Sequence, residues 1–276
     1  MRRALRRFAF YAGALAIVAV FVFPYYWQLM TAFKPPKELY AMPATWFPSE
    51  LYVGSFVKIF TLRPFPRFML NSLIIASLTT ALALFVGSLA AYALARLPIR
   101  GRIPILAGVL SASLFPGTSI VGPLFMVISG LGLVNTYPGL IWPYTSFALP
   151  FTVWVLTNFY SQIPIELEEA AEVDGCSPLQ AFYRVIVPLA APGLATTAIL
   201  VFISAWNEFL FALTFTRTEA VRTVPVAIAG FTGINDEVPW GEVSAAAVTV
   251  TLPLIILAIL FQRRIVQGLT AGAVKG

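Results

Sequence analysis

Six long apolar runs constrain this chain more than any other feature of its sequence. They lie at residues 8–31, 70–95, 103–128, 140–160, 192–215 and 243–261. Each is close to the roughly 20 residues that a helix needs to cross a hydrocarbon core of about 30 Å. None of them alternates strictly with a period of two, so a transmembrane barrel is not expected. The pattern predicts an all-α membrane protein with six transmembrane helices in a single domain, residues 1–276.

The composition also favours a multi-pass membrane protein. Of the 276 residues, 59% are hydrophobic and 11% are charged, whereas soluble chains have roughly 25% charged residues. The chain has no histidine and one cysteine, Cys176, which excludes a disulfide framework or a thiolate zinc site within the chain. The net charge of +6 does not indicate nucleic-acid binding, because the positive residues cluster at the ends of the apolar runs.

The first apolar run has two interpretations. The start MRRALRRF, followed by an apolar run, is typical of a secretory signal peptide. However, the run is long for that, no small-residue cleavage site follows it, and residues 24–30, PYYWQLM, suit a membrane interface. A retained transmembrane helix is therefore favoured.

The arginine and lysine positions predict the orientation in the membrane. One side of the predicted spans carries Arg2, Arg3, Arg6, Arg7, Arg96, Arg100, Arg102, Arg184, Arg263, Arg264 and Lys275. These residues crowd short segments next to the helix ends, so the positive-inside rule makes that side cytoplasmic. Both termini and the connection 161–190 are then cytoplasmic, and the connections 32–69 and 216–242 lie outside.

The connection 161–190 is predicted to form a sharp corner between two short helices. It carries five acids within nine residues, Glu166, Glu168, Glu169, Glu172 and Asp174. Acids favour the first turn of a helix, and Gly175 suits the position just after its end. Ser177 and Gln180 predict a capping box for the second helix, which is expected to end at Pro188. A rigid acidic corner suits a basic groove on a soluble partner, and the alternative is a solvated acidic loop.

Several stretches of the chain resemble one transporter family. EAAEVDG followed by VIVP resembles the EAA signature of the membrane subunits of ABC importers, with Val185 and Val187 in place of the usual isoleucine and leucine. The signature spacing falls on Glu169, Ala170, Ala171, Gly175 and Pro188. NSLIIA at 71–76, WNEFLFAL at 206–213 and GLTAGAVKG at 268–276 resemble the carbohydrate branch, in particular the second permease of maltose-type systems.

The resemblance implies a type I ABC importer permease fold and several partners. The subunit would pair with a second homologous permease in the prokaryotic plasma membrane to form the pathway for a sugar, a di- or oligosaccharide. An ATPase dimer would receive the EAA corners, and an extracytoplasmic solute-binding protein would deliver the sugar. The chain has no G-x-x-x-x-G-K-[ST] loop, so it is not expected to be an enzyme. It would bind no cofactor or metal, and ATP with Mg²⁺ would bind to the partner.

The resemblance also assigns roles to individual residues. Glu169 would be the charged anchor of the corner, Ala170 and Ala171 would permit close approach, and Gly175 would form the turn. Asp174 and Pro188 complete the predicted coupling residues. In similar permeases the tail inserts between the ATPase subunits, which would involve Thr270, Ala271, Gly272, Lys275 and Gly276 of the tail 262–276. A disordered end is the alternative.

Glu208 is the one ionisable residue that we expect well inside an apolar run. With Trp206 and Asn207 it could bind sugar hydroxyls in the pathway, because sugar sites combine aromatic faces with amide or carboxylate groups. The alternatives are a packed tryptophan, an interhelical asparagine bond and a carboxylate at the outer interface. Pro116-Gly117 is expected to kink or break the third helix, either as a hinge or for packing.

Other functions stay open at this point. A permease of the same superfamily could carry a polyol, glycerol phosphate or an amino acid. An intramembrane enzyme would have to work without histidine, and an ion-coupled secondary transporter would be expected to show more intramembrane carboxylates than Glu208. ATPase activity that appears only with partner subunits would separate an importer from both.

Overall fold

The computed structural model describes residues 2–232 and 237–271. In these ranges the chain consists of helices and irregular connections, without a strand. It divides into two compact units. One comprises Met1–Pro66 and Ala227–Pro253, and the other comprises Arg67–Val226 and Leu254–Gly276.

The first unit contains α1 (Arg2–Ala32), α2 (Pro36–Leu39), α3 (Gly54–Thr61) and the start of α14 (Trp240–Ala271). Polar contacts order its connections. The buried Lys34 donates from Nζ to the Thr45 carbonyl at 2.6 Å, and its ammonium lies 4.5 Å from the centre of the Trp27 ring. Arg63, just after α3, forms a 3.1 Å ion pair with Glu242 in the first turn of α14. Both cations are therefore matched by acceptors within the unit.

The second unit is built around α4 (Phe65–Arg96), α7 (Pro138–Gln162) and α11 (Ala191–Trp206). Its shorter elements are α5 (Arg102–Ala112), α6 (Gly117–Gly130), α8 (Glu166–Val173), α9 (Pro178–Ala181), the π-helical turn η1 (Phe182–Ile186), α10 (Val187–Leu189) and α12 (Leu210–Phe215). Helix α13 (Val224–Ala229), like α4 and α14, has residues in both units.

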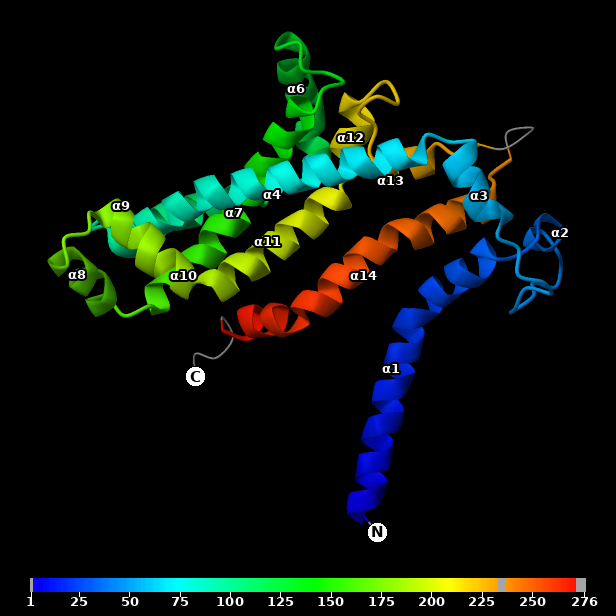
Figure 1. Cartoon of the computed structure of the whole chain (residues 1–276), viewed down its shortest axis with the longest axis horizontal. Coiled ribbons are helices and arrows are strands. Elements are labelled where there is room, and N and C mark those ends of the chain that lie inside the picture. The colour runs from blue at the N-terminus through cyan, green and yellow to red at the C-terminus, as the bar shows by residue number, and fades with distance from the viewer. Residues whose placement is uncertain (1, 233–236, 272–276) are drawn as a thin grey trace. The chain divides into compact units, whose positions relative to one another are not determined.

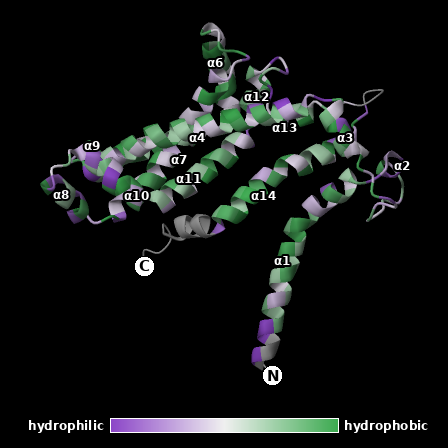
Figure 2. Ribbon diagram, in the orientation of Figure 1, coloured by the Kyte–Doolittle hydropathy of each residue, from purple (hydrophilic) through white to green (hydrophobic). Residues whose placement is uncertain are grey.

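Close packing holds the three long helices of the second unit together (Figure 1). The hydroxyls of Ser88 on α4 and Tyr160 on α7 are 2.5 Å apart. A Cβ atom added at Gly193 on α11 would lie within 2.7 Å of ring carbons of Phe159 on α7, so only glycine permits this approach. Figure 2 shows apolar residues along these helices and polar residues gathered around α8 and α9.

Four of the described helices are long and apolar enough to cross a membrane, and the number rises to six if each of two bent pairs is one span. The four are Arg6–Ala32, Phe65–Arg96, Pro138–Gln162 and Trp240–Gln262. The first bent pair is α5 with α6, at an angle of 87°. The second joins the segment Pro178–Leu189 to α11 at 77°. All-helical architecture with several spans therefore agrees with the sequence-based expectation.

Two of the predicted runs are interrupted in the structure. The run 103–128 falls on α5 and α6, and its break ends at Pro116, which has extended backbone and directly precedes α6. The proline has no backbone N–H to continue the ladder of α5 and directs the chain into a new helix. The run 192–215 falls on α11 and α12, with a break at residues 207–209.

Candidate functional site

The acidic corner is a compact unit whose turn is closed by its own backbone and side chains. Gly175 follows α8 with a φ of +90°, and its N–H donates to the Glu172 carbonyl at 2.9 Å. The N–H of Cys176 donates to the Ala171 carbonyl at 2.9 Å. These two bonds form a Schellman motif, which confirms the prediction that Gly175 lies just after the end of the first helix.

The helix after the corner begins with the predicted capping box. The N–H of Ser177 donates to Oε1 of Gln180 at 2.8 Å, and the N–H of Gln180 donates to the Ser177 hydroxyl at 3.4 Å. The prediction that this helix ends at Pro188 is wrong, since helical backbone continues through α10 to Leu189. The π-helical turn η1 shifts the hydrogen-bond register directly before Pro188. The proline therefore falls in the first turn of α10, where its missing N–H costs little.

A buried ion pair attaches the corner to the end of α4. Glu168 is 7% exposed, and its Oε2 lies 3.2 Å from Nε of Arg96. The two atoms form a charge contact rather than an aligned hydrogen bond. The Tyr92 hydroxyl, one turn before Arg96, donates to the other carboxylate oxygen of Glu168. Both oxygens of this buried carboxylate thus contact α4.

The same turn of α4 reaches two more elements. Nη2 of Arg96 donates to the carbonyl of Ile163, the residue directly after α7, at 2.7 Å. The Tyr92 hydroxyl also lies 3.5 Å from the Pro178 carbonyl at the start of α9. We call Tyr92, Arg96 and Glu168 the corner tether. It links α4 to the end of α7, to α8 and to α9, so the corner is fixed to the long helices.

The corner tether was not predicted from the sequence. Nothing in the sequence distinguished Glu168 from the other four acids of its segment, and Arg96 was used only to predict the orientation in the membrane. The i, i+4 spacing of Tyr92 and Arg96 puts both on one face of α4, and it is the one sequence signal that could have indicated a shared partner.

The predicted coupling residues lie on different faces of the corner. Glu169, Ala170 and Asp174 are exposed, whereas Ala171 is buried against the rest of the unit. Val173 is 88% exposed next to these acids. The outward face of α8 is therefore acidic with an apolar residue at its end, and Ala171 serves packing within the chain.

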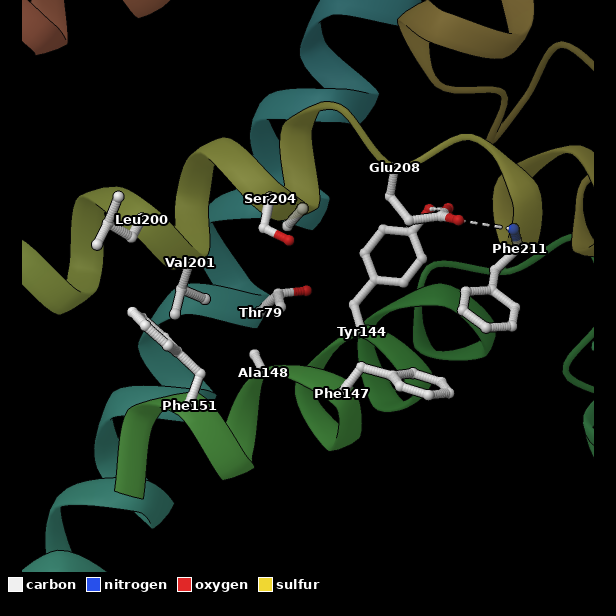
Figure 3. Close-up of a pocket in the computed structure, with 11 residues that line it drawn as sticks. Thr79, Tyr144, Phe147, Ala148, Phe151, Leu200, Val201, Ser204, Glu208 and Phe211 are labelled. Atoms are coloured by element: carbon white, nitrogen blue, oxygen red, sulfur yellow. Dashed lines mark hydrogen bonds between the residues drawn. The ribbon is translucent and has the colours of Figure 1, made fainter. Parts of the chain in front are cut away.

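A cavity of about 380 Å³ lies between α4, α7 and α11. Its walls are mostly apolar and include the rings of Tyr144, Phe147, Phe151 and Phe211 (Figure 3). The polar side chains that line it are Thr79, Tyr144, Ser204 and Glu208. The volume falls in the range of roughly 300–1,000 Å³ that small-molecule sites occupy.

Glu208 lines this cavity and also holds α12 in place. Its Oε1 accepts from the Phe211 N–H at 2.8 Å, and its Oε2 accepts from the Ala212 N–H at 3.0 Å and from the Tyr144 hydroxyl. These amides belong to the first turn of α12, where they have no partner within the helix. Glu208 is therefore a structural cap as well as a lining residue.

The three residues predicted for the pathway are not brought together on one surface. Trp206 is 3% exposed and stacks on Phe202 with ring centres 5.7 Å apart. Asn207 donates from Nδ2 to the Ile203 carbonyl of its own helix at 2.8 Å. Of the three, Glu208 is the one that lines the cavity.

The predicted tail lies partly outside the described residues. Helix α14 continues to Ala271, so Thr270 and Ala271 are helical, whereas we expected the last helix to end at residue 261 and the tail to begin at residue 262. No proline or glycine stands between Pro253 and Gly268 to end the helix earlier. Gly272, Lys275 and Gly276 lie outside the described residues. Within the described part of the chain, no cluster of three or more histidine, cysteine, aspartate or glutamate side chains could hold a metal ion.

Comparisons with known proteins agree over nearly the whole chain. The chain is 45% identical over 275 residues to the trehalose/maltose transport system permease protein MalG of Thermococcus litoralis, covering 99% of this chain and 98% of that protein. It is 45% identical to the trehalose transport system permease protein SugB of Mycobacterium tuberculosis, covering 94% of each. A chain from the crystal structure of a bacterial ABC transporter for the acidic polysaccharide alginate matches with a TM-score of 0.81 at 23% identity, over 95% of this chain and 97% of that one.

The family described as "Binding-protein-dependent transport system inner membrane component" matches residues 14–271. This range includes the corner, the cavity and the long helices of both units. The chain therefore belongs to the family of inner membrane components of binding-protein-dependent transport systems.

Proposed function

We propose that this chain is a membrane-spanning subunit of an ATP-driven ABC importer and that it forms, with a second homologous permease, the pathway for a di- or oligosaccharide. Its relatives at 45% identity are named as trehalose and maltose permeases. A relative from Streptomyces coelicolor at 35% identity is named as a diacetylchitobiose permease. The substrate shared by these names is a sugar of at least two units.

The observation that carries the proposal is the tethered acidic corner. Tyr92, Arg96 and Glu168 fix the corner to α4, and its acidic face points away from the unit. This arrangement suits a coupling element, because a push on α8 would reach α4 and α7 without bending the corner. Glu169 would face a basic residue of the ATPase, with Ala170, Asp174 and Gly175 shaping the contact.

ATP chemistry would belong to the partner. The chain has no phosphate loop, so we place ATP and Mg²⁺ in an ATPase dimer and expect no cofactor in this subunit. Closure of the dimer would shift the permease pair between outward- and inward-facing states. The end of α14, with Thr270, Ala271 and the residues that follow it, would contact the dimer near its interface.

The membrane arrangement completes the proposal. The type I importer fold would use six spans, with α5 and α6 as one broken span and α11 within another, and both termini in the cytoplasm. An extracytoplasmic solute-binding protein would dock on the outer side. In support, a second solved structure with this fold is a bacterial alginate transporter in complex with a periplasmic protein bound to alginate pentasaccharide, with a TM-score of 0.58.

A second substrate class has a specific observation in its favour. The chain is 43% identical to the sulfoquinovosyl glycerol transport system permease protein SmoH of Agrobacterium fabrum, covering 92% of this chain. A glycerol-linked, anionic sugar is therefore the alternative substrate.

Reconstitution tests the proposed function directly. The chain is purified with its companion permease, ATPase and binding protein and placed in proteoliposomes with ATP inside. Uptake of labelled trehalose or maltose is measured against vesicles that lack this subunit. We expect uptake and sugar-stimulated ATP hydrolysis in the complete assembly alone. The absence of uptake for every sugar tried in an assembled, ATP-hydrolysing complex would overturn the proposal.

A further inference from the structure

Many threonine hydroxyls in the described helices bond to their own helix. Each donates to the carbonyl four residues earlier, as do Thr80, Thr152, Thr157, Thr197, Thr214 and Thr249. This is the usual arrangement where no water is present to satisfy a hydroxyl. A hydroxyl that departs from it needs a partner elsewhere.

Thr79 departs from this arrangement. Its side chain is fully buried, and its hydroxyl has no hydrogen-bond partner among the described residues. Figure 3 shows the hydroxyl directed into the cavity between α4, α7 and α11, toward the space that Ser204 and Tyr144 also border. Thr145 is likewise buried without a partner, but it does not line this cavity. A buried polar group left unpaired is unfavourable, so a ligand hydroxyl or ether oxygen in the cavity would stabilise the Thr79 side chain.

The other walls restrict that ligand. Phe147, Phe151 and Phe211 present aromatic rings, which suit the apolar faces of a sugar ring. None of the residues that line the cavity is cationic, and the one charged group is the carboxylate of Glu208. Three donors, the Tyr144 hydroxyl and the amides of Phe211 and Ala212, already bond to this carboxylate and occupy one lone pair on Oε1 and two on Oε2. Glu208 can therefore accept little from a ligand, and its main effect on the cavity is its negative charge. Such a site disfavours an anion, because like charges repel strongly where water is scarce.

We propose that this cavity is a sugar subsite of the pathway, contributed by this chain, which accepts uncharged sugar rings and rejects anionic ones. The proposal rests on the proposed function and narrows its substrate class. Thr79 and Ser204 bond to ring hydroxyls from opposite walls, and the aromatic rings cover the faces of the sugar. Sugars that carry a sulfonate or a carboxylate are excluded by the carboxylate of Glu208 and by the lack of a cation among the lining residues.

Protection of a single cysteine tests the proposal. The complete transporter is prepared with Cys176→Ser, which removes the one native thiol of this chain, and with Ala148→Cys, which places a reporter on the cavity wall formed by α7. The rate of modification by N-ethylmaleimide is measured without the binding protein, so that the sugar selectivity of the binding protein does not affect the result. The additions are maltose, trehalose or maltobionate, a disaccharide acid of similar size to maltose. A reporter at Val173→Cys, on the exposed corner, is the control for effects on the reagent.

We expect maltose or trehalose to slow modification of the cavity reporter, and maltobionate to leave it unchanged. Adding Thr79→Val should raise the sugar concentration for half protection by about three- to tenfold, the loss of one hydrogen bond. The matched change Thr80→Val removes a hydroxyl that bonds to its own helix. It should change the sugar concentration for half protection less than twofold. Ala205→Cys on the wall formed by α11 provides a second reporter if the first impairs assembly.

The outcomes separate the two proposals. The same preparation is assayed for sugar uptake with the binding protein restored. Three results would overturn the subsite proposal without affecting the proposed importer function. They are uptake without protection of the reporter, equal protection by maltose and maltobionate, and equal effects of Thr79→Val and Thr80→Val. Failure of uptake for every sugar would instead remove the proposed function.

Discussion

The guanidinium of Arg96 lies 3.2 Å from the carboxylate of Glu168, and both side chains are less than a tenth exposed. This pair joins the end of α4 to the acidic helix α8. Buried pairs of this kind are sensitive to the loss of one member, because the other is then left charged without a partner.

Breaking the corner tether should therefore destabilise the subunit. Glu168→Gln or Arg96→Met alone should lower stability by about 3–5 kcal/mol, since each leaves a buried group unmatched. Replacing both together, with Arg96→Met and Glu168→Leu, should recover most of the loss. Thermal unfolding of the purified complex measures the effect. Glu166→Gln, an exposed acid on the same helix, is the control and should change nothing. A double variant as unstable as the single ones would contradict this account.

The exposed acid next to Glu168 should matter for coupling instead of stability. Glu169→Lys should abolish sugar uptake while the subunit stays in the membrane at normal abundance, because the side chain is exposed on the acidic face. Uptake of labelled sugar is compared with membrane abundance by immunoblot. Normal uptake in this variant would refute docking through the acidic face.

The turn at Gly175 should tolerate no branched side chain. Its φ of +90° is costly for any residue with a Cβ, so Gly175→Val should distort the corner and strongly reduce sugar-stimulated ATP hydrolysis. Gly108→Ala in α5 is the matched control, because a Cβ there meets nothing within 4 Å. Equal hydrolysis rates in the two variants would show that the geometry of this turn is dispensable.

The cap formed by Glu208 gives a further stability prediction. Glu208→Ala leaves two amides of α12 and the Tyr144 hydroxyl without their acceptor. Each buried donor left unpaired costs about 1–3 kcal/mol. The melting temperature of the complex should fall clearly with Glu208→Ala. Glu208→Gln keeps one acceptor oxygen, so it should lower the melting temperature less. Glu219→Ala, an exposed acid, serves as the reference. A melting temperature of Glu208→Ala equal to that of the wild type would show that Glu208 does not stabilise α12.

The single cysteine tests orientation. Cys176, half-buried beside the corner, should resist impermeant thiol reagents added to intact cells and react once the membrane is opened. Labelling from outside would reverse the predicted topology, including the cytoplasmic placement of both termini.

Local signals in the sequence predicted the corner well. Gly175, Ser177 and Gln180 adopt the predicted roles because caps and turns depend on a few neighbouring residues. Which acid of α8 turns inward could not be predicted, because that depends on Arg96, which lies 72 positions earlier in the chain. Adjacent residues on a helix point about 100° apart, so burying Glu168 exposes Glu169.

The breaks in the long helices were harder to predict than the helices themselves. Pro116 marks the first, but the second falls at residues 207–209 inside an apolar run that hydropathy reads as continuous. Glu208 makes that break stable by capping α12, which becomes visible only when Tyr144 and the two amides are seen around it. Trp206 adopts the packed position that we gave as the alternative to a pathway role, and Asn207 bonds to its own helix instead of to another one.

The self-closed turn between α8 and α9 has a thermodynamic consequence. Its Schellman motif and capping box satisfy the helix ends before any partner arrives. A segment that is already ordered loses little conformational entropy on association. In a proposed cycle of repeated loading and release, this corner would therefore move as a rigid body, and little free energy would be lost at each turnover in folding and unfolding it.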